Sequence, residues 1–579
     1  MITVRTSPQY VNRVRQDWTA NGGVYGDDGV YAIVPSNDPF AQLGPTLDLT
    51  FAGIPTNQFT AATTDGYSIN LNLSSEIYQI AAEYVVWSDY QVRYSLLPNA
   101  LINAALNIEP EKSLFKDTLI GGRPLGDINN DGTVTSADAT AYTRFNGSFW
   151  LNTADRNDYI RTVLNPYMLA NPGLYAAYLS PGPLAAKTFA DVITFTRAST
   201  GTYFDSAGVL QSAANDQPRF DYNPSTLAAQ GLLIEEQRTN GIRNNTMQGA
   251  VAGTPGTLPT NWTFSTTGAA TTQVVGTGTE NGITYIDIRF QGTGAADTWN
   301  IIYDTSVVAA NGQSWTSAVY LKLAAGSAAN LPLVQRLVFR NSSFVNIQAL
   351  DSSAITPTNA GLATQRSTLS LTATQATTAF VTNQLNSGTP TGAYDITLRI
   401  GLPQLEQGAF ATSVIPTTTT ALTRSADVAS VNTLSPWWNA SEGTFYVEGS
   451  AGSLANSPIF VMPHDGTSNN YLNSPLLTTA GLARLAGVVG GAAWTNVNTA
   501  NSTTANTTFK SASAFKAGDQ AICLNAGTVA TGVNASVPVV TTVKLGDWRT
   551  SGNSINGYLR RISYFPRRLA NADLQTITT

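Results

Sequence analysis

The chain has 579 residues, which is too long for a single hydrophobic core, so we expect about three or four domains. Only 12% of the residues are charged, and 31 basic against 37 acidic side chains give a net charge of −6. The Lys and Arg residues are scattered, so we expect no surface for nucleic acid. No run of about 18 apolar residues occurs, so we also expect no transmembrane helix and no membrane insertion.

The chain start and the cysteine content indicate where the protein folds. Residues 1–8 lack a basic segment followed by an apolar run, so no secretory signal peptide is expected. Cys523 is the single cysteine, and its apolar neighbours predict a packed core position rather than a disulfide. Both features favour folding in a reducing cytoplasm. The 48 glycines, with many Thr, Ser and Asn residues, predict a β-rich protein with many tight turns.

Residues 1–115 carry short apolar runs with the alternation typical of strands, at 29–34, 67–73 and 83–94. We interpret this region as a small mixed or β-rich domain. No residues with evident chemistry stand out in it, and we expect it to serve as an attachment domain.

Residues 116–180 contain the clearest ligand pattern of the chain. Oxygen donors occur at positions 1, 3, 5 and 12 of a loop whose sixth residue, Gly132, permits a sharp turn. The expected calcium ligands are Asp127, Asn129, Asp131, Thr133 through its carbonyl, Thr135 through its hydroxyl or a water, and Asp138. Oxygen-only ligands suit Ca²⁺ better than a softer metal.

This loop, with the helix expected at 136–145, resembles one calcium repeat of a dockerin module. Dockerins carry two repeats, and residues 152–158, where the second is due, lack the spacing. The resemblance therefore implies calcium bound in a loop that it stiffens, and the missing repeat argues against cohesin binding. The helical spacing that follows, over 153–178, is interrupted by prolines, and we place a domain boundary near residue 180.

The next segment predicts a hairpin, with strands on both sides of an Asp-Ser-Ala-Gly turn at 205–208. Residues 195–210, 218–224 and 231–240 together resemble a segment of bacteriophage virion proteins of tail-fibre or baseplate type. In that family the segment precedes a β-sandwich.

Residues 241–428 contain strands of period two, at 261–264, 285–290, 315–323 and 394–400, separated by Gly, Asn and Thr turns. The pattern predicts a sandwich or jelly roll and looks like a carbohydrate-binding module. The closing sequence 401–427 resembles the end of the same phage module. We therefore expect one unit over 185–428.

Residues 436–579 form a further predicted β-domain, with strands at 443–449 and 557–565 and a short helix at 571–576. Its order and length resemble a concanavalin A-like jelly roll of laminin-G type. The predicted fold class is thus mainly β and multidomain, with two β-sandwich or jelly-roll domains following the N-terminal region and its dockerin-like calcium loop.

Catalytic residues are not expected. Glu235 and Glu236 are adjacent in a strand, so they point to opposite faces and cannot flank one glycosidic bond; ion pairs with Arg219 or Arg238 at a hairpin edge are the simpler role. His464 is the only histidine and lies in a turn sequence, without a nucleophile elbow. Hydrolysis by a carboxylate pair from distant strands remains open.

Glycan binding is the better expectation, because sugar rings stack on flat aromatic side chains while polar groups bind their hydroxyls. The candidate residues are Trp262, Trp299, Trp315, Trp494 and Trp548. Each has an alternative role as a core residue, since aromatic side chains in strands are often buried.

The resemblances imply a bacteriophage virion structural protein of tail-fibre or baseplate type that mediates adhesion to host surface glycans. They also imply contacts with other virion proteins, a homo-oligomer with a trimer favoured, and synthesis in the host cytoplasm. One alternative is a head-attached fibre or decoration protein. The other is a polysaccharide-degrading enzyme or depolymerase with binding modules.

Overall fold

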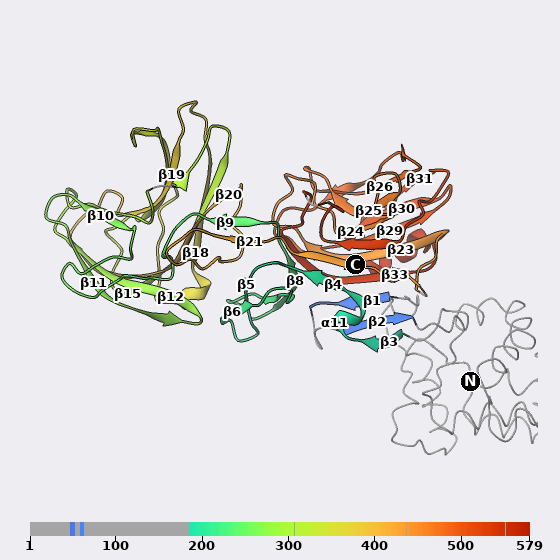
Figure 1. The fold of residues 1–579 in the computed structure, drawn as a ribbon, viewed down its shortest axis with the longest axis horizontal. Coiled ribbons are helices and arrows are strands. Elements are labelled where there is room, and N and C mark those ends of the chain that lie inside the picture. Colours follow the sequence, from blue (N-terminus) through green and yellow to red (C-terminus); the bar gives the residue numbers. More distant parts are fainter. Residues whose placement is uncertain (1–46, 53–57, 63–183, 306, 436, 551) are drawn as a thin grey trace, which may run out of the picture.

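The computed structural model describes residues 47–52, 58–62, 184–305, 307–435, 437–550 and 552–579. In these ranges the chain is nearly all β-strand and forms two β-sandwiches, with two short α-helices, α11 (Phe189–Val192) and α12 (Asn571–Ile577) (Figure 1). The predicted mainly β, multidomain fold is confirmed. The calcium loop expected at 127–138 and the strands expected at 29–34 and 67–94 lie outside the described residues.

The first body, the middle sandwich, consists of a six-stranded and a five-stranded sheet. The six-stranded sheet contains β10 (Thr263–Thr266), β13 (Trp299–Ile302), β14 (Val307–Val308), β16 (Val334–Arg340), β17 (Asn346–Asp351) and β19 (Phe380–Asn386). The five-stranded sheet contains β11 (Thr271–Glu280), β12 (Ile283–Gly292), β15 (Ser314–Gly326), β18 (Arg366–Thr372) and β20 (Tyr394–Gln407), and the short 3-10 helix η2 (Leu362–Thr364) precedes β18.

Alternation along these strands builds the core between the two sheets. Ile286 and Ile288 of β12 point inward together with Leu337 and Phe339 of β16, and all four are fully buried. Burying each such side chain contributes roughly 1.5–3 kcal/mol relative to leaving it exposed. The period-two pattern in the sequence thus places the expected strands correctly.

The second body, the C-terminal jelly roll, consists of a ten-stranded and an eight-stranded sheet. The ten-stranded sheet contains β1 (Leu47–Thr50), β2 (Gln58–Ala62), β3 (Leu184–Lys187), β7 (Phe220–Tyr222), β8 (Ala229–Ile234), β23 (Glu442–Ser450), β29 (Phe509–Lys516), β30 (Gln520–Leu524), β31 (Ala530–Gly532) and β33 (Gly557–Phe565). The eight-stranded sheet contains β4 (Thr194–Thr196), β22 (Val428–Val431), β24 (Val461–His464), β25 (Tyr471–Leu477), β26 (Leu482–Val489), β27 (Ala492–Ala493), β28 (Val497–Ser502) and β32 (Thr542–Leu545).

Three segments from earlier in the chain pair with strands of this jelly roll, across the boundaries expected at 115, 185 and 428. Strand β1 pairs with β33, with Leu47 opposite Tyr564. Strand β8 pairs with the other end of β33, and β4 pairs with β22. The physical reason is that β33 and β22 would otherwise present unpaired edges, and segments far away in the sequence cover them.

The middle sandwich is therefore an insertion in the jelly roll. The chain leaves through β9 (Arg238–Asn240) and returns through β21 (Leu422–Arg424), and these two strands pair as a ribbon between the two bodies (Figure 1). The predicted hairpin is confirmed as β5 (Gly201–Phe204) and β6 (Leu210–Ala213), which lie beside this ribbon. None of the helices in the described ranges has the length and apolar character needed to span a bilayer.

Candidate functional site

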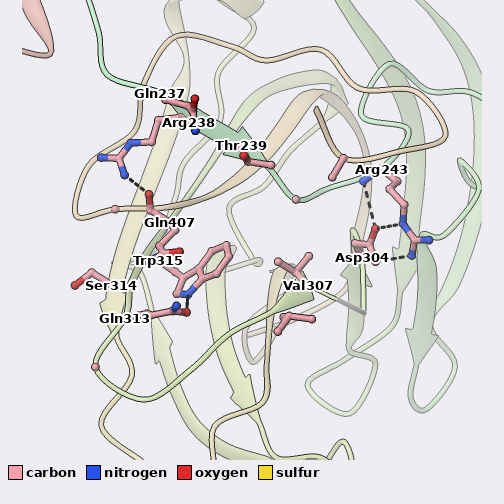
Figure 2. Close-up of a pocket in the computed structure, with 15 residues that line it drawn as sticks. Gln237, Arg238, Thr239, Arg243, Asp304, Val307, Gln313, Ser314, Trp315 and Gln407 are labelled. Atoms are coloured by element: carbon pink, nitrogen blue, oxygen red, sulfur yellow. Dashed lines mark hydrogen bonds and ion pairs between the residues drawn. The ribbon is translucent and has the colours of Figure 1, made fainter. Parts of the chain in front are cut away.

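A groove of about 800 Å³ opens where the ribbon enters the middle sandwich (Figure 2). One wall is the segment from β9 to residue 243, and the other is formed by β14, the start of β15 and the end of β20. Its lining is about equally polar and apolar, and the side chains that face it include Gln237, Arg238, Thr239, Arg243, Asp304, Gln313, Ser314 and Trp315.

Arg243 and Asp304 form a two-point pair on one side of the groove. Arg243 Nε lies 2.8 Å from Asp304 Oδ2, and Nη2 lies 3.0 Å from Oδ1. The Asp304 side chain is 1% exposed, whereas that of Arg243 is 34% exposed. The hydrogen bonds from the Asp304 carboxylate raise the pKa of Arg243. The pair is thus electrically balanced, with its guanidinium presented to solvent.

Arg238 closes the other end of the groove. It donates from Nη1 to the carbonyl of Gln407, pairs with Glu236 at 2.5 Å, and lies 4.9 Å above the ring of Phe410. Gly408 has a φ of +145°, and a side chain at this position would collide with the Arg238 guanidinium. A glycine is needed here because the backbone conformation and the close approach both exclude a Cβ.

The floor between these two arginines combines apolar and polar groups. Trp315 donates from Nε1 to Gln313 Oε1 at 3.2 Å, and Val307 packs against Gly241 on the facing wall. The ribbon above is held by the Thr239 and Thr423 hydroxyls, which are 2.7 Å apart. The groove therefore offers donors and acceptors at fixed positions with little net charge, an arrangement suited to a ligand rich in hydroxyl groups.

The structure brings one of the predicted tryptophans, Trp315, to this groove, but as part of its floor. Trp262, Trp299, Trp315 and Trp494 are only 5%, 1%, 6% and 8% exposed. Their ring faces are covered by core neighbours, as when Trp299 stacks on Phe290 at 3.8 Å. The prediction that these four rings stack on sugars is corrected, because a covered face cannot contact a ligand.

Trp262 and Trp548 contact residues elsewhere in the chain. Trp262 donates from Nε1 to the carbonyl of Arg243 at 3.2 Å and so positions that residue from behind. Trp548, the fifth candidate, is half-buried and packs edge-on against Tyr471 at 4.9 Å, in the jelly roll and away from the groove.

Arg243 and Asp304 were not predicted, since a charged residue beside a predicted strand does not differ in sequence from other surface charges.

A second assembly, which we call the junction cluster, lies where hairpin, ribbon and jelly roll meet. It consists of Arg197, Arg219, Glu235, Arg424 and Asp427, none of them more than 4% exposed. Asp427 pairs with Arg219 at 2.5 Å and with Arg197 at 3.1 Å. Glu235 pairs with Arg219 and with Arg424, both at 2.9 Å. All five residues come from the segments that resemble the opening and closing parts of the phage module.

Hydrogen bonds complete the cluster. Both the amide and the hydroxyl of Ser413 donate to Glu235, at 2.7 and 2.6 Å. Burial alone would raise the pKa of Glu235, but Arg424, Arg219 and Ser413 together lower it to about 2. Glu235 therefore stays ionised and cannot supply a proton to a substrate. Ion pairs of the two glutamates with Arg219 or Arg238 were expected, and in the structure Glu235 pairs with Arg219 and Glu236 with Arg238. Glu235 is buried, however, rather than at an exposed edge.

The other residues considered for chemistry have structural roles. His464 Nδ1 accepts a hydrogen bond from the amide of Gly466 at 2.9 Å, and burial lowers its pKa. Cys523 is buried, as predicted. Within the described ranges, no group of three or more His, Cys, Asp and Glu side chains is placed to hold a metal ion.

Comparisons with known proteins give a fold likeness only. No family model matches the sequence. No curated protein matches it either. Similar solved structures include the CBM40 of the Ruminococcus gnavus IT-sialidase bound to α2,3-sialyllactose, at 14% identity over 24% of this chain and 84% of that chain, with a TM-score of 0.22.

Two further likenesses concern other classes of protein. Domain 4 of AbnA, an arabinanase from Geobacillus stearothermophilus, in complex with arabinotriose, matches at 11% identity over 30% of this chain and 81% of that chain, with a TM-score of 0.23. The enzymatically active domain of tailspike protein 4 from bacteriophage CBA120 matches at 12% identity over 26% of this chain and 20% of that chain, with a TM-score of 0.19. With TM-scores this low, these likenesses carry no argument about function.

Proposed function

We propose that this chain is a structural protein of a bacteriophage virion, of tail-fibre or baseplate type, that displays a glycan-binding β-sandwich to the host surface. The observation that carries the proposal is the junction cluster. The sequence segments that resemble a phage virion module supply its five charged residues, and these meet in one buried site.

The cluster supports a display function because it fixes the base of the middle sandwich. Arg219 comes from the segment before the ribbon, Arg424 is the last residue of its returning strand β21, and Asp427 follows it. Their ion pairs tie the entry and exit of the sandwich together on the jelly roll. A sandwich anchored at both ends of its chain is suited to present a surface rather than to move.

The groove supports glycan binding. Its fork of Arg243 and Asp304 and its amide side chains provide donors and acceptors for sugar hydroxyls, and Val307 provides apolar contact. Glycan hydroxyls are recognised by such fixed polar groups in a concave site.

A binding rather than a catalytic role is favoured by the surroundings of three buried carboxylates, Glu235, Asp427 and Glu406. Arginines hold Glu235 ionised and form ion pairs with Asp427, and Glu406 accepts hydrogen bonds from the amide and hydroxyl of Thr412, both at 2.7 Å. A glycosidase needs one carboxyl group that stays protonated near neutral pH. Turnover of a polymer by the purified chain, abolished by substitution of one acidic residue, would favour the depolymerase alternative.

Calcium binding at Asp127, Asn129, Asp131 and Asp138 belongs to the same proposal. A metal bound to the folded state raises its stability by mass action. Asp127→Ala should therefore lower the melting temperature, and a chelator should reproduce the loss in the unmodified chain. If neither treatment changes the melting temperature, the loop holds no ion that matters for folding.

The proposal is tested by labelling purified phage particles with an antibody against this chain and imaging them. Label on the tail or baseplate supports it, and label on the head favours the alternative of a head fibre or decoration protein. Particles without label would overturn the virion assignment. Cross-linking of the purified protein then tests the expected homo-oligomer, with a trimer favoured.

A further inference from the structure

A second exposed surface of the middle sandwich combines apolar rings with an arginine that has no carboxylate partner in the described residues. Phe344 is 50% exposed and stacks on Phe380, with ring centroids 4.6 Å apart and planes inclined by 9°. Val308, 72% exposed, lies opposite Phe380 in the pairing of β14 with β19. Arg340 lies opposite Phe380 on its other side, in β16. We call these four residues the Phe344 shelf.

The loop that carries Phe344 is held in one conformation. The Asn341 amide donates to the carbonyl of Val345 at 3.0 Å, and Asn341 Oδ1 accepts from the amides of Ser343 and Val345, both at 3.0 Å. Phe344 has a φ of +59°, a conformation that is costly for a bulky residue. Its ring is half exposed, so core packing does not account for a phenylalanine at this strained position.

Arg340, the charged residue of the shelf, has no carboxylate partner among the described residues. Arg340 Nε donates to Asn346 Oδ1 at 2.9 Å, and within the described residues no carboxylate lies at ion-pair distance from its guanidinium. Burial lowers the pKa of Arg340. Arg336, further along the same strand, differs because it pairs with Asp351 at 2.5 Å. An anion placed over the shelf would provide for Arg340 what Asp351 provides for Arg336.

We infer that the Phe344 shelf binds a sugar ring that bears a carboxylate, with the apolar face of the ring on Phe344 and the carboxylate on Arg340. Flat aromatic faces suit the C–H face of a sugar ring, and guanidinium groups bind carboxylates by charge-assisted hydrogen bonds. The inference rests on the proposed glycan binding and specifies its ligand as an acidic glycan.

The shelf and the groove are continuous at β14. Val308 lines the groove and also contacts the shelf through its pairing with Phe380. Neighbouring sugars of one chain can therefore occupy both, an acidic sugar on the shelf and hydroxyl groups of the next unit in the groove. The groove pairs its arginines with carboxylates, so the acidic sugar is assigned to the shelf.

The test uses the full chain and an array of oligosaccharides that carry hexuronic or nonulosonic acids, each beside its methyl ester. We expect the acid to bind about tenfold more tightly than its ester, because only the acid can form the charge-assisted bond with Arg340. Arg340→Gln should remove this difference. Arg289→Gln, which alters the net charge equally but lies in the five-stranded sheet, should keep it.

The contribution of the ring is tested separately. Phe344→Asn removes the aromatic face while tolerating the left-handed backbone, so the loop should keep its conformation. This variant should weaken the acid and the ester alike by about tenfold, and Phe344→Tyr should retain binding.

Four results would overturn the inference: equal binding of acids and esters, loss of the preference in Arg289→Gln, unchanged binding in Phe344→Asn, or no binding to any oligosaccharide on the array. A concentration-dependent dimer that Phe344→Asn abolishes would instead assign the shelf to a second copy of the chain. Binding that depends on Arg243 alone would overturn the assignment of the acidic sugar to the shelf and leave the proposed glycan function in place. Unlabelled particles together with an array without binding would overturn both.

Discussion

The junction cluster and the groove use the same chemical pair, an arginine and a carboxylate, but they differ in exposure. Arg219 and Asp427 have no exposed side-chain surface, and each oxygen of Asp427 and Glu235 receives a hydrogen bond or ion pair from the protein. In the groove, Arg243 keeps 34% of its side chain exposed, and its Nη1 has no acceptor among the described residues. The buried pair of the junction cluster can therefore only hold the chain together, whereas the pair in the groove can also contact a ligand.

The largest expected effect on stability is that of Asp427→Asn in the junction cluster. Removing this carboxylate leaves Arg197 buried without a carboxylate partner and Arg219 with Glu235 alone, so the free energy of unfolding should fall by about 3–5 kcal/mol. Urea denaturation of the full chain measures the loss. Asp395→Asn is the matched control, because Asp395 pairs with Arg289 at 2.6 Å on an exposed surface. Equal midpoints for the two variants would mean that the junction cluster does not hold the two bodies together.

The second prediction uses the low pKa of Glu235. The folded-state pKa of about 2 lies below the ordinary value of 4.5, so the stabilisation is complete above pH 4.5 and is lost as the pH falls toward 2. The loss should be on the order of 3 kcal/mol. Burial raises the pKa of Asp221, which works in the opposite direction.

Glu235→Gln identifies the share of Glu235 in this acid sensitivity. The variant should be less stable at neutral pH, and its unfolding midpoint should change less between pH 5 and 2 than that of the unmodified chain. An identical pH profile in both proteins would assign the acid sensitivity to other carboxylates.

The third prediction concerns the groove. Arg243→Lys keeps the charge but loses the two-point fork to Asp304, and we expect it to weaken glycan binding about tenfold with little change in unfolding midpoint. Arg336→Lys is the control, since it breaks a comparable fork with Asp351 elsewhere on the same sandwich. Calorimetric titration with an oligosaccharide that binds the unmodified chain measures both variants. A similar effect of both substitutions would show that the groove is not the site.

The sequence predicts the strands of both bodies well, because alternation is local. The strand expected at 557–565 matches β33 in both bounds, and the strand expected at 394–400 lies within β20. The sequence does not predict that β1 and β8 cover β33, because such pairing joins segments hundreds of residues apart and leaves no local pattern.

The site was less predictable than the strands for a related reason. Aromatic residue type indicates a large apolar side chain but not the face on which it lies, so four of the five candidate tryptophans proved to be core residues. Phe344 was missed, although its place after the polar run Asn341-Ser342-Ser343 could have indicated an exposed loop. Ion pairs of Glu235 and Glu236 with Arg219 or Arg238 were predicted, since these arginines lie close in the sequence. The pair of Glu235 with Arg424 joins distant segments and was not predicted.

The smallest predicted effect on stability is that of removing an exposed ion pair. Arg289→Gln removes an exposed pair with Asp395, and we expect no measurable shift in the urea midpoint, because solvent already screens both charges. Salt separates the two kinds of pair further. At about 1 M salt the Debye length is roughly 3 Å, which screens surface charges but reaches a buried pair poorly. The loss caused by Asp427→Asn should therefore persist at high salt, and its disappearance there would mean that water enters the junction cluster.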